Sequence, residues 1–316
     1  MNEWDIIERF FHRPPRSPQV ILGVGDDAAV MDVPKNHHWV TSVDTLVEGT
    51  HFFPHAPPAE LGYKSLAISL SDLAAMGAEP DTVLLALTLP EADEAWLQLF
   101  SQGFFSLMEE YQLSLIGGNI ARGPLNISTI VHGWVPKNQA IRRSTAVAGD
   151  SIYITGSLGD AGLALDLMRR GGDVPVALSQ RFYRPTPRVL EGLALRGLAS
   201  AAIDISDGLA ADLHKLLQAS RLGAVIQVEK LPLSRVLQQH CREAVTQRYY
   251  ALTAGEDYEL CFTVSPDHRK QVEAALAPFS CGFHCIGEVT RSLGLHIRDA
   301  QGNPFPITHT GYEHFS

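Results

Sequence analysis

Short apolar runs alternate with longer amphipathic stretches along the first 135 residues of the chain. The runs are rich in β-branched and aromatic residues, which favour a pleated, half-buried strand. Between them, two stretches at 60–76 and 91–111 carry apolar residues at three- to five-residue spacing, which is typical of a helix. The predicted strands are 20–22, 39–43, 82–89 and 125–135. This pattern predicts a first domain in which strands alternate with helices.

A polar, basic segment at 136–150 interrupts the pattern and is the predicted linker. The alternation then resumes and continues toward the end of the chain. The predicted strands are 151–155, 201–205, 225–228, 258–264 and 284–289, and the predicted helices are 160–170, 187–198 and 209–219. Because 316 residues exceed what a single hydrophobic core usually organises, we expect two domains, over 1–137 and 149–316.

Charge and hydropathy exclude several classes of function. The chain has 35 acidic and 25 basic residues, a formal net charge of −10, whereas binding a nucleic-acid backbone needs clustered positive charge. The apolar runs are strand-sized, so we predict no membrane segment. The N-terminus is acidic and amphipathic, unlike a secretory signal, and the four cysteines do not form a disulfide framework. We therefore expect a cytoplasmic protein that binds neither nucleic acid nor membrane.

Aspartates recur where predicted apolar strands end. Asp26 and Asp27 follow the first strand among small residues, which allow a ligand to approach the backbone closely. Ser42 and Asp44 are two residues apart, so their side chains point to one side of an extended chain. Asp72 lies in an otherwise apolar helix, where an isolated buried charge is costly. These positions predict that a positive group meets the carboxylates.

The same arrangement returns in the second half, with Asp204, Ser206 and Asp207 at the end of a strand. Oxygen ligands without converging His or Cys suit a hard cation such as Mg²⁺, and Mg²⁺ in an acidic protein suggests a bound polyphosphate. The alternative is that each acid closes a turn or caps a helix, as Asp26 and Asp207 are placed to do. Recurrence at Gly-flanked strand ends favours the metal interpretation.

Common nucleotide and nucleophile motifs are absent from the sequence. There is neither a Gly-x-x-x-x-Gly-Lys-Ser/Thr loop nor a Gly-x-Ser-x-Gly elbow, and Gly23-Val-Gly25 is followed by acids. The segment 156–162 suits either anion binding at a helix start or close helix packing. Among 13 histidines, His51 stands out because it closely follows the second acidic motif, and the tail at 311–315 carries two aromatics.

Taken together and in order, eight motifs resemble the thiamine-monophosphate kinases, a family within the superfamily named after aminoimidazole ribonucleotide synthetase. The motifs are Gly25–Ala29, Ser42–Phe52, Leu70–Ala78, Ile116–Asn119, Arg143–Ser144, Ile203–Leu209, Gly255–Leu260 and Gly311–Phe315. The resemblance implies an α+β fold of two domains and a homodimer, with the N-terminal domain supplying the dimer contact and much of the ATP site. It also implies ATP-dependent phosphorylation of thiamine monophosphate to thiamine diphosphate, by direct in-line transfer without a covalent enzyme intermediate.

The resemblance also implies a role for individual residues. The implied Mg²⁺ ligands are Asp27, Ser42, the backbone carbonyl of Val43, Asp44, Asp72, Asn119, Asp204 and Asp207. The implied ATP contacts are Gly118, Asn119, Arg143 and Ser206, and the implied thiamine monophosphate contacts are His51, Glu256 and Tyr312. Asn119 stands where the family usually has Asp, so one ligand has lost its negative charge, which weakens the expected Mg²⁺ binding.

Two alternatives to this assignment stay open. One is another ATP-using member of the superfamily, although hydrogenase-maturation relatives use a C-terminal cysteine and selenophosphate synthetases an early reactive one. Here the sequence ends His-Phe-Ser, and its first cysteine is Cys241. The other is a non-catalytic sensor of nucleotide and Mg²⁺, which the change at Asn119 permits.

Overall fold

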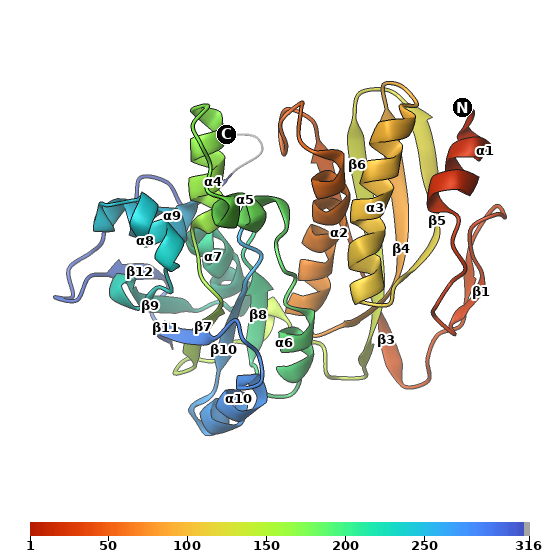
Figure 1. Cartoon of the computed structure of the whole chain (residues 1–316). Coiled ribbons are helices and arrows are strands. Elements are labelled where there is room, and N and C mark those ends of the chain that lie inside the picture. Colours follow the sequence, from red (N-terminus) through yellow and green to blue (C-terminus); the bar gives the residue numbers. More distant parts are fainter. Residues whose placement is uncertain (313–316) are drawn as a thin grey trace. The chain divides into compact units, whose positions relative to one another are not determined.

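The computed structural model describes residues 1–312, which form two compact units, each built from helices and sheets (Figure 1). The first unit comprises Met1–Leu73 and Ala78–Asn138, and the second comprises Ala74–Gly77 and the chain from Gln139 onward. This division into two mixed units confirms the α+β class. Within the described residues, no helix is both long and apolar enough to cross a membrane.

A four-stranded sheet organises the first unit, in the order β3-β6-β4-β5. Its strands are β3 (His37–Val47), β6 (Asn126–Pro136), β4 (Glu79–Leu89) and β5 (Ser114–Arg122). Neighbouring strands are antiparallel except for β4 and β5, which are parallel. The N-terminal elements are α1 (Glu3–Ile6), the π-helical turn η1 (Ile7–Phe11), β1 (Val20–Leu22) and β2 (Val30–Met31). Because β3 lies at an edge of this sheet, only one of its two sides pairs with another strand of the sheet, β6.

Helices α2 (Pro58–Ala75) and α3 (Glu94–Glu110) cover one face of this sheet (Figure 1). They pack closely because glycines stand at their contact: a Cβ on Gly103 would lie 1.8 Å from the Ala59 carbonyl oxygen. Along β3 the side chains alternate, so the opposite face of the sheet carries Trp39 and Val43, which are 41% and 60% exposed. The sheet therefore has one helix-covered face and one open, partly apolar face.

A six-stranded sheet organises the second unit, in the order β12-β9-β11-β7-β10-β8. All neighbouring pairs are antiparallel except β12 with β9. The strands are β7 (Ser151–Thr155), β8 (Ala201–Asp204), β9 (Gly223–Gln227), β10 (Leu260–Val264), β11 (Phe283–Thr290) and β12 (Gly294–Arg298). The α-helices are α4 (Asp160–Arg169), α5 (Val176–Tyr183), α6 (Val189–Ala194), α7 (Leu209–Ser220), α8 (Arg235–His240), α9 (Ala244–Thr253) and α10 (Arg269–Leu276), and the 3₁₀ turns are η2 (Arg143–Thr145), η3 (Val228–Lys230) and η4 (Pro266–His268).

Most predicted elements occur where the sequence placed them, but β2, β5, β12 and several helices were not predicted. Strand β5 was missed because glycines weaken a strand pattern. The structure explains one of them: a Cβ on Gly118 would lie 1.9 Å from the Leu85 carbonyl oxygen, so glycine is required by the close approach of β4. The helix predicted from residue 91 begins at Glu94, because the Asp93 side chain caps it by accepting hydrogen bonds from the Ala95 and Trp96 amides.

Candidate active site

Two of the predicted carboxylates meet between β3 and α2. Ser42 and Asp44 project from β3 toward the helix, and the Ser42 hydroxyl donates a hydrogen bond to the Asp72 carboxylate. Burial, and then the nearby charge of Asp72, raise the pKa of Asp44 to about 6, although a hydrogen bond with Ser69 opposes this shift. Within the described residues, the buried Oδ2 of Asp44 has no hydrogen-bond partner. Paired carboxylates with an unsatisfied oxygen suit a bound cation.

The raised pKa of Asp44 leads to a prediction about stability. Because the pKa of Asp44 in the folded state, about 6, exceeds its ordinary value of 3.8, this group's stabilising contribution is complete below pH 3.8 and is lost as pH rises through 6. Asp44→Asn stays neutral at every pH. In the presence of a chelator, its Tm should therefore exceed that of the wild type at pH 8 and match it near pH 4, as measured by thermal denaturation.

The control for this prediction is Glu110→Gln, which removes a charge from an exposed position in the same unit. Its Tm difference from the wild type should not vary with pH in this way. If Asp44→Asn gained no stability over the wild type above pH 6, the proposed repulsion between buried carboxylates would be wrong.

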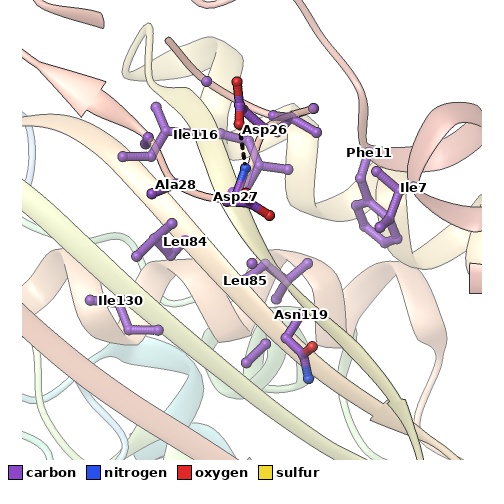
Figure 2. A pocket seen from close by; sticks show the side chains of 18 of the residues that line it. Ile7, Phe11, Asp26, Asp27, Ala28, Leu84, Leu85, Ile116, Asn119 and Ile130 are labelled. Carbon is purple, nitrogen blue, oxygen red and sulfur yellow. Dashed lines mark hydrogen bonds between the residues drawn. The ribbon is translucent and has the colours of Figure 1, made fainter. Parts of the chain in front are cut away.

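A pocket of about 760 Å³ lies over the open face of the same sheet (Figure 2). Leu84 and Ile130 form part of its floor, and the loop at 23–29 and residues Ile7 and Phe11 form its walls. The predicted residues Asp27, Gly118 and Asn119 all line it. This size suits a nucleotide.

The charges lining this pocket are acidic. Asp26 and Asp27 contribute carboxylates, and none of the described residues that line the pocket is Lys or Arg. The Asp26 carboxylate accepts a hydrogen bond from the amide of the adjacent Asp27 at 2.8 Å (Figure 2). A phosphate group would need a cation to approach this loop, so the donor set fits Mg²⁺ with a polyphosphate better than a free anion.

In the second unit, the loop after β8 brings predicted residues together through the main chain. Asp204 ends β8 and is 4% exposed, and Ser206 and Asp207 follow it. The Ser206 carbonyl accepts a hydrogen bond from the Glu256 amide at 2.8 Å, and the Asp207 carbonyl accepts one from the Tyr312 amide at 3.0 Å. The main chain at two predicted substrate-side residues is therefore bonded to the loop that carries the predicted nucleotide-side residues. The rest of the tail motif, residues 313–315, lies outside the described part of the chain.

The segment that carries Glu256 has an unusual backbone. Gly255, Glu256 and Tyr258 have φ angles of 71°, 64° and 51°, a conformation that side chains other than glycine rarely adopt. The buried Asp257 anchors the segment by accepting the Gly159 amide hydrogen bond, with each carboxylate oxygen 3.0 Å from the nitrogen. Strained backbone held by its surroundings is common at functional sites. Here it fixes the backbone position from which the Glu256 side chain projects.

His51 and Arg143 are placed by local contacts. The Val47 amide donates a hydrogen bond to Nδ1 of His51 at 3.0 Å, so the neutral ring carries its proton on Nε2. Arg143 lies in η2, where Ser220 at the end of α7 donates to its carbonyl at 2.7 Å. The turn η2 also lies against β8, the strand that leads into the loop with Ser206.

The structure also contains candidate residues that sequence reasoning missed, Asp212 and Lys215 on α7. The Asp212 carboxylate accepts hydrogen bonds from the loop before the helix, and Lys215 contacts both Asp207 and Asp212. An acid and a lysine three residues apart in a helix usually form a solvated surface pair, so their spacing was not informative. Within residues 1–312, no three His, Cys, Asp or Glu side chains are gathered as a metal site.

Comparison with known proteins places the chain in a family. Residues 25–135 match the model of the AIR synthase related protein, N-terminal domain, and residues 147–299 match that of the C-terminal domain. The thiamine-monophosphate kinase of Escherichia coli (strain K12) is 46% identical over 323 residues, which cover 100% of this chain and 98% of the relative. The chain belongs to the thiamine-monophosphate kinase family.

Solved structures of thiamine-monophosphate kinases share the fold. The enzyme from Stenotrophomonas maltophilia K279a has a TM-score of 0.85 at 39% identity, with 95% of each chain covered. AaThiL complexed with AMPPCP and TMP has a TM-score of 0.78 at 33% identity, with 92% of each chain covered. These findings confirm the family resemblance that the eight motifs indicated.

Proposed function

We propose that this protein is an enzyme that uses ATP to phosphorylate thiamine monophosphate, yielding thiamine diphosphate. The observation that carries the proposal is the 46% identity, over its whole length, to a thiamine-monophosphate kinase. The related AaThiL structure holds AMPPCP and TMP, which correspond in chemistry to a nucleoside triphosphate and a phosphate acceptor. The acidic pocket over the sheet and the paired carboxylates of Asp44 and Asp72 supply residues that such a reaction needs.

The chain's own residues suit direct in-line transfer between two anions. The glycines inside strand β5 and the loop at 23–29 give backbone and carboxylate groups to the nucleotide side. We propose Asp27, Ser42, the Val43 carbonyl, Asp44, Asp72, Asn119, Asp204 and Asp207 as the ligands of Mg²⁺. When bound, Mg²⁺ would neutralise the phosphates and orient the transferred group. We further propose that Gly118, Asn119, Arg143 and Ser206 contact ATP.

On the acceptor side we propose His51, Glu256 and Tyr312 as contacts of thiamine monophosphate. Glu256 offers a carboxylate to the cationic thiazolium ring, and its fixed backbone limits the directions in which that carboxylate points. Tyr312 is 45% exposed and offers an aromatic face, which attracts a flat cation. His51 donates from Nε2 when neutral, because its Nδ1 is occupied by the Val47 amide.

Turnover of the purified protein tests the proposal directly. Protein, ATP, Mg²⁺ and thiamine monophosphate should give thiamine diphosphate, detected by chromatography, while free thiamine should give no product. Product from free thiamine alone would contradict the assignment. Nucleotide binding without turnover of any thiamine compound would instead favour the sensor that the Asn119 position permits.

Asn119→Asp restores a charge at a proposed ligand that lines the pocket. We expect the Mg²⁺ concentration for half-maximal activity to fall about 3- to 10-fold, because a carboxylate binds a hard cation more tightly than an amide oxygen does. The measurement is the rate as a function of Mg²⁺ at saturating ATP. Asn138→Asp, which makes the same change in an exposed turn, is the control. Identical Mg²⁺ titrations for Asn119→Asp and the wild type would exclude Asn119 as a ligand.

We also propose that the protein is a homodimer and that it resides in the cytoplasm. The open face of the first sheet, where Trp39 and Val43 are exposed, is a suitable dimer contact because exposed apolar faces commonly mark interfaces. Sedimentation equilibrium should then give twice the 34.5 kDa mass of the chain. The cytoplasmic location fits the cysteines, all four of which are free thiols.

A further inference from the structure

We propose that Asp212 is a positioning residue, which fixes the loop at 206–208 and thereby holds nucleotide-side and acceptor-side residues in one arrangement. The inference rests on the proposed kinase function, because that function gives Ser206, Asp207, Glu256 and Tyr312 their roles. Asp212 itself is 1% exposed and lies on α7, one turn beyond the loop. It is therefore shielded from direct contact with a ligand in solvent.

A single oxygen of Asp212 collects the amides of the whole loop. Its Oδ2 accepts hydrogen bonds from the backbone N–H groups of Ser206, Asp207 and Gly208, at 2.9, 2.9 and 3.2 Å. The other oxygen, Oδ1, accepts from Nζ of Lys215 at 2.7 Å. Hydrogen bonds to a charged acceptor are stronger than neutral ones, so this carboxylate is well suited to hold three successive amides.

The carbonyl groups of residues 205–207 accept hydrogen bonds from the acceptor-side segments. The Ile205 carbonyl accepts from the Tyr258 amide at 2.8 Å, the Ser206 carbonyl from the Glu256 amide at 2.8 Å, and the Asp207 carbonyl from the Tyr312 amide at 3.0 Å. The amides of the loop are therefore bonded to Asp212, and its carbonyl groups are bonded to the segments that carry the proposed substrate contacts.

Lys215 also connects the Asp212 carboxylate to the side chain of Asp207. Its Nζ donates to Asp207 Oδ2 as well as to Asp212, so it links the buried carboxylate to a proposed metal ligand. Removing the Asp212 charge in Asp212→Asn would weaken the hydrogen bonds of the loop amides to their shared acceptor and would also loosen Lys215. Because small errors in the position of reacting groups cost large factors in rate, the loss should appear in catalysis as well as in stability.

The test compares Asp212→Asn with a matched variant, Asp150→Asn. Asp150 is likewise a buried carboxylate of the second unit, 2% exposed, and accepts the Val147 amide at 2.9 Å, but it does not bond to the loop. We expect Asp212→Asn to lower kcat about 10- to 100-fold and to raise KM for both ATP and thiamine monophosphate, assayed well below its Tm. Asp150→Asn should lose stability without this loss of kcat.

Hydrogen exchange supplies a readout that does not depend on turnover. In the ligand-free wild type, the amides of residues 206–208 should exchange as slowly as those of β8, and in Asp212→Asn they should exchange faster while β8 stays protected. Unprotected loop amides in the wild type would overturn the proposal even if the variant failed to fold. Equal losses of kcat in Asp212→Asn and Asp150→Asn, or wild-type kinetics in Asp212→Asn, would also overturn it. Absence of turnover in the wild type would refute the kinase function. The exchange result would still show whether Asp212 holds the loop at 206–208.

Discussion

Asp72→Asn should reduce kcat for thiamine diphosphate formation about 10²- to 10³-fold, the scale seen when one preorganised electrostatic contact is removed from an active site. Asp72 sits opposite Asp44 and accepts the Ser42 hydroxyl. The Asn side chain keeps an oxygen for Ser42 but lacks the negative charge, and a carboxylate binds a divalent cation more tightly than an amide oxygen does. The fold should therefore survive while the proposed metal site fails. Steady-state rates with ATP and thiamine monophosphate, together with Tm, measure both effects.

Asp93→Asn is the matched control for this experiment. It also removes one negative charge from the first unit, at the start of α3, where Asn caps a helix as well as Asp does. Its rate and Tm should stay close to those of the wild type. A near-normal rate for Asp72→Asn across the whole range of Mg²⁺ concentration would argue against the role of Asp72 as a ligand.

Glu259→Ala should reduce the free energy of unfolding by about 3–5 kcal/mol, because it removes the buried carboxylate that pairs with two partly buried arginines, Arg181 and Arg188. Glu259 is 0% exposed. Its carboxylate accepts from Nε and Nη2 of Arg188, both at 2.6 Å, from Nη2 of Arg181 at 2.9 Å and from the Thr155 hydroxyl at 2.7 Å. The two arginines come from α5 and the start of α6, so this carboxylate ties both segments to β7 and β10. Urea denaturation followed by circular dichroism measures the change.

Glu229→Ala serves as the comparison for the loss of an ion pair. Glu229 pairs with Arg248 at 3.5 Å, and its side chain is 34% exposed, so the change in unfolding free energy should stay below about 1 kcal/mol. If the two variants lost similar amounts of stability, Glu259 would not be the structural centre that its contacts indicate.

The sequence was most informative where function depends on local pattern. Asp44 was predicted from its place after an apolar run and Asp72 from its place in an apolar helix. The structure brings both to one place because Ser42 and Asp44 share a face of β3. The pattern also predicted most strands of both sheets. Strand β5 was not predicted, because its glycines are required by the close backbone of β4, a partner that local patterns do not reveal.

Interactions between distant parts of the chain explain what the sequence did not reveal. Thr155 and Glu259 are 104 residues apart, yet they share a hydrogen bond that completes a buried ionic cluster. The hydrogen bonds of Asp212 to residues 206–208 depend on the path of the loop before α7 and not on any recognisable motif. The positive φ angles at Glu256 and Tyr258 arise from main-chain bonds to the Ile205–Ser206 loop, which only the folded chain brings into reach.

The backbone conformation at Glu256 limits how acceptor preference can be redesigned. Position 256 is anchored through its amide and has a φ of 64°, so a new side chain must tolerate the left-handed region whatever its chemistry. Asn, Asp and Gly adopt that region most readily, whereas β-branched Val, Ile and Thr are strongly disfavoured there. Libraries aimed at alternative phosphate acceptors should therefore draw on the first group at this position and place bulkier variation elsewhere.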